Sequence, residues 1–259
     1  MSAASPFAQA GRRGAVVAGF DGSDRAWEAV HWAAAEAAHR RRPLLLVHAH
    51  LASVTSAWGT VAAPGWGAAA VFDNTPLLRE AEEQLLMAAE VCRRGEPGLD
   101  VSVEVLEGRT SAVLTEVARS VQAELVVVGT SGQWALSRVL LGSKATDLAH
   151  DVDVPVVAVR SGPADRSGPV VVAVNGTAEC MTAVQFAASQ AERHSCELRP
   201  VHEDSRMLLD HSEGARLLVV SDHGDSAVQR ALFGSVIRTA LTRAPCPVAV
   251  VPKAATAGP

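Results

Sequence analysis

The stretch VVVGTSGQWALSRVLLGS, residues 126–143, decides the fold of this chain. It opens with an apolar run and continues as Gly129-x-x-Gly132, nine residues, and then Gly142-Ser143. An apolar run without polar alternation is typical of a strand buried on both faces of a parallel sheet. Glycines directly after such a strand let the backbone turn and approach a ligand closely. The stretch therefore predicts a parallel α/β sheet with a glycine-rich loop at the carboxyl end of one strand.

The chain contains a degenerate internal repeat. Residues 142–160 align without gaps on residues 234–252, an offset of 92. Residues 20–23, FDGS, align on residues 174–177, VNGT, at an offset of 154. Because 154 − 92 = 62, the second copy is a version of the first that lacks 62 residues. We expect two tandem domains, 14–160 and 169–252, joined by the polar, Gly- and Pro-containing linker 161–168.

Apolar runs and amphipathic stretches alternate along the first copy, which predicts strands separated by helices. In the first helix Trp27, Val30, Ala34 and Ala37 form an apolar stripe, whereas Glu28, Glu36 and Arg40 lie off it. The missing residues of the second copy correspond to a long loop, one helix and one strand, so four strands rather than five are expected there. The expected strands of the first copy are 15–20, 44–48, 101–105, 125–128 and 154–159, and the later helices are 76–94 and 111–121.

Composition and charge exclude several classes of protein. The net charge is -5 and the pI about 6.0, which disfavours nucleic acid and anionic membrane as partners. No apolar run approaches the ~18–20 residues of a membrane-spanning helix, and residues 1–14 lack the apolar core of a signal peptide, so we expect a cytoplasmic protein. The four cysteines are scattered and include no Cys-x-x-Cys pair, which suggests neither a disulfide framework nor a cysteine zinc site.

The glycine-rich segment also predicts an anion site. Ser143 is expected to cap the helix that follows, where its hydroxyl and the neighbouring amides face an anion such as phosphate. Asp21 follows the first strand, at the edge of the sheet where ligands of parallel α/β proteins bind, and could accept a hydrogen bond from a ribose hydroxyl or a base amine. The Walker pattern and Gly-x-Gly-x-x-Gly are both absent, which argues against a P-loop NTPase and a dehydrogenase.

Four segments together resemble the universal stress protein family: GFDGS at 19–23, LLLVHAH at 44–50, EGRT at 107–110, and the Gly-x2-Gly-x9-Gly-Ser motif at 129–143. The resemblance covers nearly the whole chain as a tandem pair and implies two open parallel-sheet, Rossmann-like nucleotide-binding domains, the second shortened. It further implies ATP, bound with Mg²⁺, as the ligand. The implied adenine contacts are Asp21 and Ala49, the implied phosphate contacts are Gly129, Gly132, Gly142 and Ser143, and Val128 and Lys144 would add mainly backbone contacts.

The sequence departs from the family pattern at several positions. Ala145 stands where a second hydroxyl residue is common. In the second copy Asn175 replaces Asp21 and Ser221 replaces Gly129. A residue with a Cβ atom is disfavoured at positive φ, so we expect the second copy to bind nucleotide weakly or not at all.

Other polar residues have competing interpretations. Arg138 lies inside the glycine motif and is either a phosphate clamp or a surface charge. His48 and His50 alternate at a strand end, but no Cys, Asp or Glu completes a metal-ligand spacing, so a structural role is favoured. The remaining histidines, His194 among them, are expected at the surface or at helix ends. The run Arg40-Arg41-Arg42 is expected to be a solvated helix C-terminus, and residues 51–75 are expected to be a loop, either a lid or surface chain.

We interpret the chain as an ATP-binding, nucleotide-responsive stress or regulatory protein with its site in the first copy. No positioned general base can be argued from the sequence, so turnover would be limited to slow hydrolysis or autophosphorylation. Two alternatives stay open: a slow ATPase or autophosphorylating enzyme, and a nucleotide-free protein-interaction module. The two copies are expected to pair through their last strands, 154–159 and 247–251, as an intrachain pseudo-dimer; a homodimer and an unidentified protein partner are further expectations.

Overall fold

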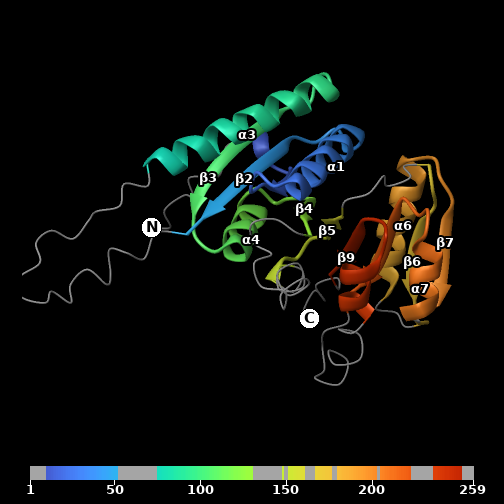
Figure 1. Ribbon diagram of the computed structural model, residues 1–259. Helices are drawn as coiled ribbons and strands as arrows, with labels where there is room; N and C mark the ends of the chain where they lie inside the picture. The colour runs from blue at the N-terminus through green and yellow to red at the C-terminus, as the bar shows by residue number, and fades with distance from the viewer. Residues whose placement is uncertain are drawn as a thin grey trace, which may run out of the picture.

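The computed structural model describes residues 10–51, 75–130, 148, 151–160, 167–176, 180–202, 205–222 and 236–252. We call residues 10–160 the first half and residues 167–252 the second half. Their described strands form one sheet in the order β3-β2-β1-β4-β5-β9-β8-β6-β7. Figure 1 shows the two halves side by side, with β5 and β9 between them.

The elements of the first half are η1 (Ala10–Arg12), β1 (Val16–Gly19), α1 (Asp24–Arg40), β2 (Leu44–His50), α3 (Thr75–Gly95), β3 (Val101–Glu107), α4 (Thr110–Ser120), β4 (Leu125–Gly129) and β5 (Val156–Val159). Those of the second half are β6 (Val170–Val174), α6 (Met181–Arg193), β7 (Leu198–His202), α7 (Ser205–Ser212), β8 (Leu217–Ser221) and β9 (Val248–Val251), and residues 236–243 are also helical. No helix in the described part of the chain is both long and apolar enough to cross a membrane.

The strand positions reproduce the internal repeat. Strand β6 begins 154 residues after β1 (170 − 16), and β8 begins 92 residues after β4 (217 − 125). Strand β9 likewise begins 92 residues after β5 (248 − 156). Within the described ranges β3 and α3 have no counterpart in the second half, which has four strands, as predicted.

Both faces of the sheet are covered by helices. Successive residues of a strand point to opposite faces. Accordingly Val16 and Ala18 pack in one apolar cluster with α1, α3 and α6. Val17, between them, packs in a second cluster with α4, α7 and the 236–243 helix. This two-sided burial explains why the strands are apolar throughout rather than alternating.

The two halves are joined by antiparallel pairing of their last strands, with Val156 opposite Val250 and Ala158 opposite Val248. This is the contact predicted from the sequence for segments 154–159 and 247–251. The strand pairs within each half are parallel. The pairing therefore fuses the two expected sheets into one continuous sheet across the chain.

Candidate functional site

The strand order of the first half reverses at β1 and β4, whose carboxyl ends therefore lie side by side at one edge of the sheet. The chain runs from β1 to β2 and β3 on one side, and then crosses β1 to form β4 and β5 on the other. In open parallel sheets this reversal of strand order opens a crevice outside the carboxyl ends of the two strands that flank it. Asp21 follows β1 and Gly129 ends β4, so both predicted site residues lie at this reversal.

The Asp21 loop is held by its own hydrogen bonds. Oδ1 of Asp21 accepts from the backbone N–H of Ser23 at 3.1 Å and from its hydroxyl at 2.6 Å. The Ser23 hydroxyl oxygen in turn accepts from the backbone N–H of Ala26 at 3.2 Å and so caps α1. Between them Gly22 has a φ of 78°, which a residue with a side chain rarely adopts. The loop thus fixes the carboxylate, while Oδ2 makes no hydrogen bond within the described residues.

Gly129 permits a close contact between strand and helix. A Cβ atom at this position would stand 2.7 Å from the backbone oxygen of Arg25 in the first turn of α1. Side chains cannot approach so closely, so only glycine allows α1 to begin directly against the end of β4. The sequence indicated a glycine for ligand approach, and the structure adds this packing role, which the motif by itself did not suggest.

His48 supports the same edge of the sheet. Its Nδ1 donates to the backbone oxygen of Phe20 at 3.0 Å, next to Asp21. Burial lowers the pKa of His48, which favours the neutral ring. No group of three metal-ligating side chains occurs in the part of the chain that the structure describes. Through its hydrogen bond to Phe20, His48 holds the end of β1 in place.

The other predicted contacts divide into two groups. Ala49 of β2 is buried, and Val128 of β4 packs on the same cluster, so both would offer a ligand mainly their backbone. The remaining predicted residues lie outside the described ranges, and so do residues 52–74 of the expected loop. These predicted residues are Gly132, Arg138, Gly142, Ser143 and Lys144.

The corresponding edge of the second half differs. Asn175 stands at the position of Asp21, and Ser221, which is buried, stands at the position of Gly129. Helix α6 is described from Met181, and residues 177–179 before it lie outside the described ranges.

Comparison with known proteins agrees with this architecture. The model of the universal stress protein family matches residues 13–160 and 203–252. The chain belongs to the universal stress protein family. The second match begins only at α7, so β6, α6 and β7 lie outside it, although they occupy the repeat positions of β1, α1 and β2.

Individual relatives share the family and the tandem length. A universal stress protein of Mycolicibacterium smegmatis is 32% identical over 190 residues, which cover 72% of this chain and 63% of that protein. One from Mycobacterium tuberculosis is 28% identical over an alignment that covers 91% of this chain and 96% of the relative. The crystal structure of a universal stress protein from Archaeoglobus fulgidus superposes with a TM-score of 0.70 at 16% identity, covering 92% and 96% of the two chains. This last similarity concerns the fold.

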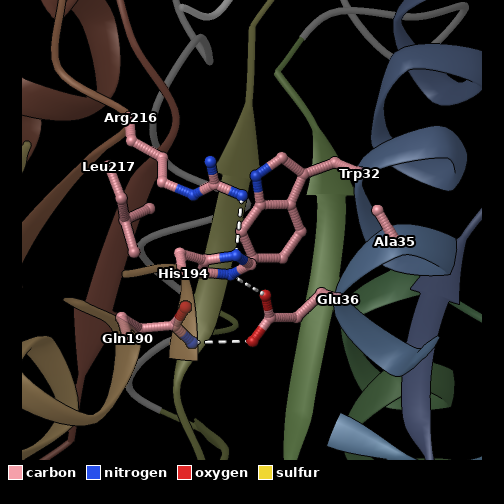
Figure 2. A pocket seen from close by; sticks show the side chains of 7 residues that line it. All are labelled: Trp32, Ala35, Glu36, Gln190, His194, Arg216 and Leu217. Atoms are coloured by element: carbon pink, nitrogen blue, oxygen red, sulfur yellow. Dashed lines mark hydrogen bonds and ion pairs between the residues drawn. The ribbon is translucent and has the colours of Figure 1, made fainter. Parts of the chain in front are cut away.

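In this universal stress protein a polar cluster joins the two halves beside the β5–β9 pairing. Figure 2 shows Glu36 of α1 facing Gln190 and His194 of α6, with Arg216 beyond the imidazole ring. Gln190 Nε2 donates to Glu36 Oε1 at 2.8 Å, and His194 Nε2 lies 3.0 Å from Glu36 Oε2. Arg216 contacts the other ring nitrogen, Nδ1, at 2.8 Å. Since a guanidinium can only donate, Nδ1 is the acceptor and Nε2 carries the proton that bonds Glu36.

The internal repeat relates the members of this cluster. Gln190 and His194 are the counterparts of Glu36 and Arg40, each 154 residues later, and Arg216 is the counterpart of Glu124, 92 residues later. In the first half Arg40 pairs with Glu124 at 3.5 Å; in the second half His194 pairs with Arg216. Glu36 and Gln190, which are equivalent in the repeat, therefore meet across the junction, one charged and one neutral.

This cluster corrects the expectation for Arg40. Glu36 and Arg40 lie off the apolar stripe of α1, yet Glu36 is 2% exposed and the Arg40 side chain 9%, because α6 and residue 124 cover them. Arg40 is therefore not part of a solvated helix end. His194 lies at the end of α6, one of the two places expected for it, and its side chain is 6% exposed. Burial alone would raise the pKa of Glu36, but hydrogen bonds from His194 and Gln190 and the charge of Arg40 outweigh it and lower the pKa to about 2.

Proposed function

We propose that this universal stress protein binds ATP at the carboxyl edge of β1 and β4 in its first half and acts as a nucleotide-responsive regulatory protein. The observation that carries the proposal is the Asp21 carboxylate, held through Oδ1 at the reversal of strand order, while Oδ2 has no partner among the described residues. An ionised carboxylate accepts hydrogen bonds only, and the adenine amine and the ribose hydroxyls are donors. The described residues therefore fit the nucleoside part of the ligand.

The other proposed contacts follow the sequence motif. The backbones of Ala49 and Val128 would line the nucleoside, and Gly129 would lead the chain into the phosphate-binding segment. ATP would bring Mg²⁺ with it, neutralising part of the phosphate charge. The proposed phosphate contacts beyond Gly129 are Gly132, Arg138, Gly142, Ser143 and Lys144.

We propose one site per chain. The second half has Asn175 in place of the carboxylate, and the buried Ser221 in place of the glycine that α1 packs against in the first half. An amide can accept one hydrogen bond from a ligand but carries no charge, and hydrogen bonds to charged groups contribute about 1.5–3 kcal/mol against about 1 for neutral ones. The difference of about 0.5–2 kcal/mol corresponds to binding that is about 2- to 30-fold weaker at the second edge.

The test combines identification with titration. Small molecules released by denaturing the purified full chain are identified by mass spectrometry, and ATP with magnesium is then titrated by calorimetry. The ligand panel includes cAMP and dAMP, since solved complexes of other universal stress proteins contain them. We expect one ATP per chain, and phosphate release from the same samples measures turnover.

Two matched variants locate the site. Asp21→Asn keeps an acceptor for Ser23 but removes the charge, and should weaken ATP binding by about 2- to 30-fold. Asn175→Ala changes the equivalent position of the second half and should leave ATP binding unchanged. Binding of two ATP molecules per chain, equal losses in both variants, or no heat at millimolar ATP would each overturn the proposal.

A further inference from the structure

Two arginines flank the point at which the chain leaves β4. Arg25 is the second residue of α1, and its backbone lies against Gly129, the last residue of β4. Arg160 directly follows β5, whose last residue, Val159, accepts a hydrogen bond from the backbone N–H of Thr130 at 3.0 Å. Both arginines therefore lie at the carboxyl edge of the sheet, Arg25 against Gly129 and Arg160 next to the residue that bonds Thr130.

Neither arginine has a counter-charge in the described part of the chain. Nη1 of Arg160 is buried there without a hydrogen-bond partner. Burial lowers the pKa of Arg160, and so does the positive charge of Arg25, so the two cations act on each other. In contrast, Arg12, Arg40 and Arg199 each pair with a glutamate. An arginine stays charged in proteins, and a buried donor without an acceptor costs free energy, so an anionic ligand at this pair would be stabilising.

The arginine pair belongs to the first half alone. The repeat position of Arg25 is Glu179 (25 + 154), which lies outside the described residues, and that of Arg160 is Pro252 (160 + 92). The second copy therefore carries neither cation at these positions. Both arginines thus lie in the first half, which also contains Asp21 and Gly129.

The separation between the ends of β1 and β5 is similar to the length of a nucleotide's phosphate chain. Asp21 follows β1, and Arg160 follows β5 two strands away, with β4 between them. Two interstrand spacings amount to about 10 Å. A nucleoside held at Asp21 would thus direct its distal phosphates, rather than the phosphate next to the ribose, towards the arginines.

We propose that Arg25 and Arg160 bind the distal phosphates of the nucleotide, so that this chain prefers nucleoside di- and triphosphates to monophosphates. The proposal rests on the proposed function, because it takes the nucleoside to lie at Asp21. The shared chemistry is a polyphosphate anion, which either a nucleotide or inorganic pyrophosphate can supply.

The test measures selectivity in the full chain. ATP, AMP and inorganic pyrophosphate are titrated by calorimetry into the wild type, Arg25→Gln, Arg160→Gln and the double variant. We expect wild type to bind ATP more tightly than AMP, and each single variant to weaken ATP binding by about 10-fold or more with a change of less than about threefold for AMP. Arg94→Gln is the matched control, because it removes one positive charge from an exposed arginine and should leave the ATP-to-AMP ratio unchanged.

The outcomes separate this proposal from the proposed function. If ATP binds but the ATP-to-AMP ratio is the same in wild type and the double variant, the arginine proposal fails and the nucleotide site stands. If pyrophosphate binds in a way that depends on both arginines, and ATP does not bind, the arginine pair is an anion site and the nucleotide function fails. If neither ligand binds, both proposals fail. Removing an unpaired charge should not lower the thermal stability of ligand-free Arg160→Gln, which distinguishes ligand binding from a folding role.

Discussion

Replacing Glu36 by glutamine removes one negative charge from the junction of the two halves and nearly keeps the size of the side chain. The pKa of Glu36 lies at about 2 against an ordinary value of 4.5. One pKa unit corresponds to about 1.36 kcal/mol, so the ionised form stabilises the folded chain by about 3 kcal/mol relative to the neutral form. We therefore expect Glu36→Gln to lower the free energy of unfolding by about 3 kcal/mol at pH 7.

The pH dependence has a defined sign. Because the folded pKa is lower than the unfolded one, the stabilisation by Glu36 is complete above the unfolded pKa and is lost as the pH falls towards about 2. The difference between wild type and Glu36→Gln should therefore shrink steadily below about pH 5.

Urea unfolding of both proteins at about pH 7, 5 and 3, followed by circular dichroism, measures this difference. Glu90→Gln is the control, since Glu90 forms an exposed pair with Arg94 at 3.0 Å and should change stability by less than about 0.5 kcal/mol. A difference for Glu36→Gln below about 1 kcal/mol at pH 7, or one that does not change with pH, would refute the reasoning.

Two further predictions concern packing. Gly129→Ala should lower the unfolding free energy by about 1–3 kcal/mol, because its Cβ would meet the Arg25 backbone at 2.7 Å, whereas Gly95→Ala meets nothing within 4 Å and should not destabilise the chain; equal melting temperatures for the two variants would contradict the close contact. Burial raises the pKa of Cys246 to about 12, so this thiol should resist a thiol reagent at mildly alkaline pH in the folded chain and react after unfolding in urea. Peptide mass spectrometry that finds Cys246 labelled as fast as the less buried Cys196 would overturn this.

Much of the fold could be predicted from local pattern. Strands β4 and β9 lie in the apolar runs 125–128 and 247–251, with ends that agree within one residue. The helix predicted over 76–94 is α3, Thr75–Gly95. These elements are readable because a strand covered on both faces must be apolar at every position, and a helix on a sheet must be apolar on one side.

The candidate site was predictable only in part. Asp21 and Gly129 are adjacent to strand ends in the sequence, and parallel strands bring such ends to one edge, so their proximity follows from topology. The bond of His48 to Phe20 does not follow, nor does the lack of a partner for Arg160 Nη1 among the described residues, because each depends on which groups from distant segments lie opposite.

The amino-acid sequence by itself determined the strands, the repeat with its 62 missing residues, and the position of Asp21 at a strand end. These are consequences of local hydrophobic pattern and of chain connectivity. Only the tertiary structure decided that Glu36 is buried against Gln190 and His194, 154 and 158 residues further along the chain. The apolar pattern of a helix shows that a polar residue such as Glu36 does not face the sheet beneath that helix. Whether water or the second half of the chain covers this residue depends on packing between distant segments, which local pattern does not encode.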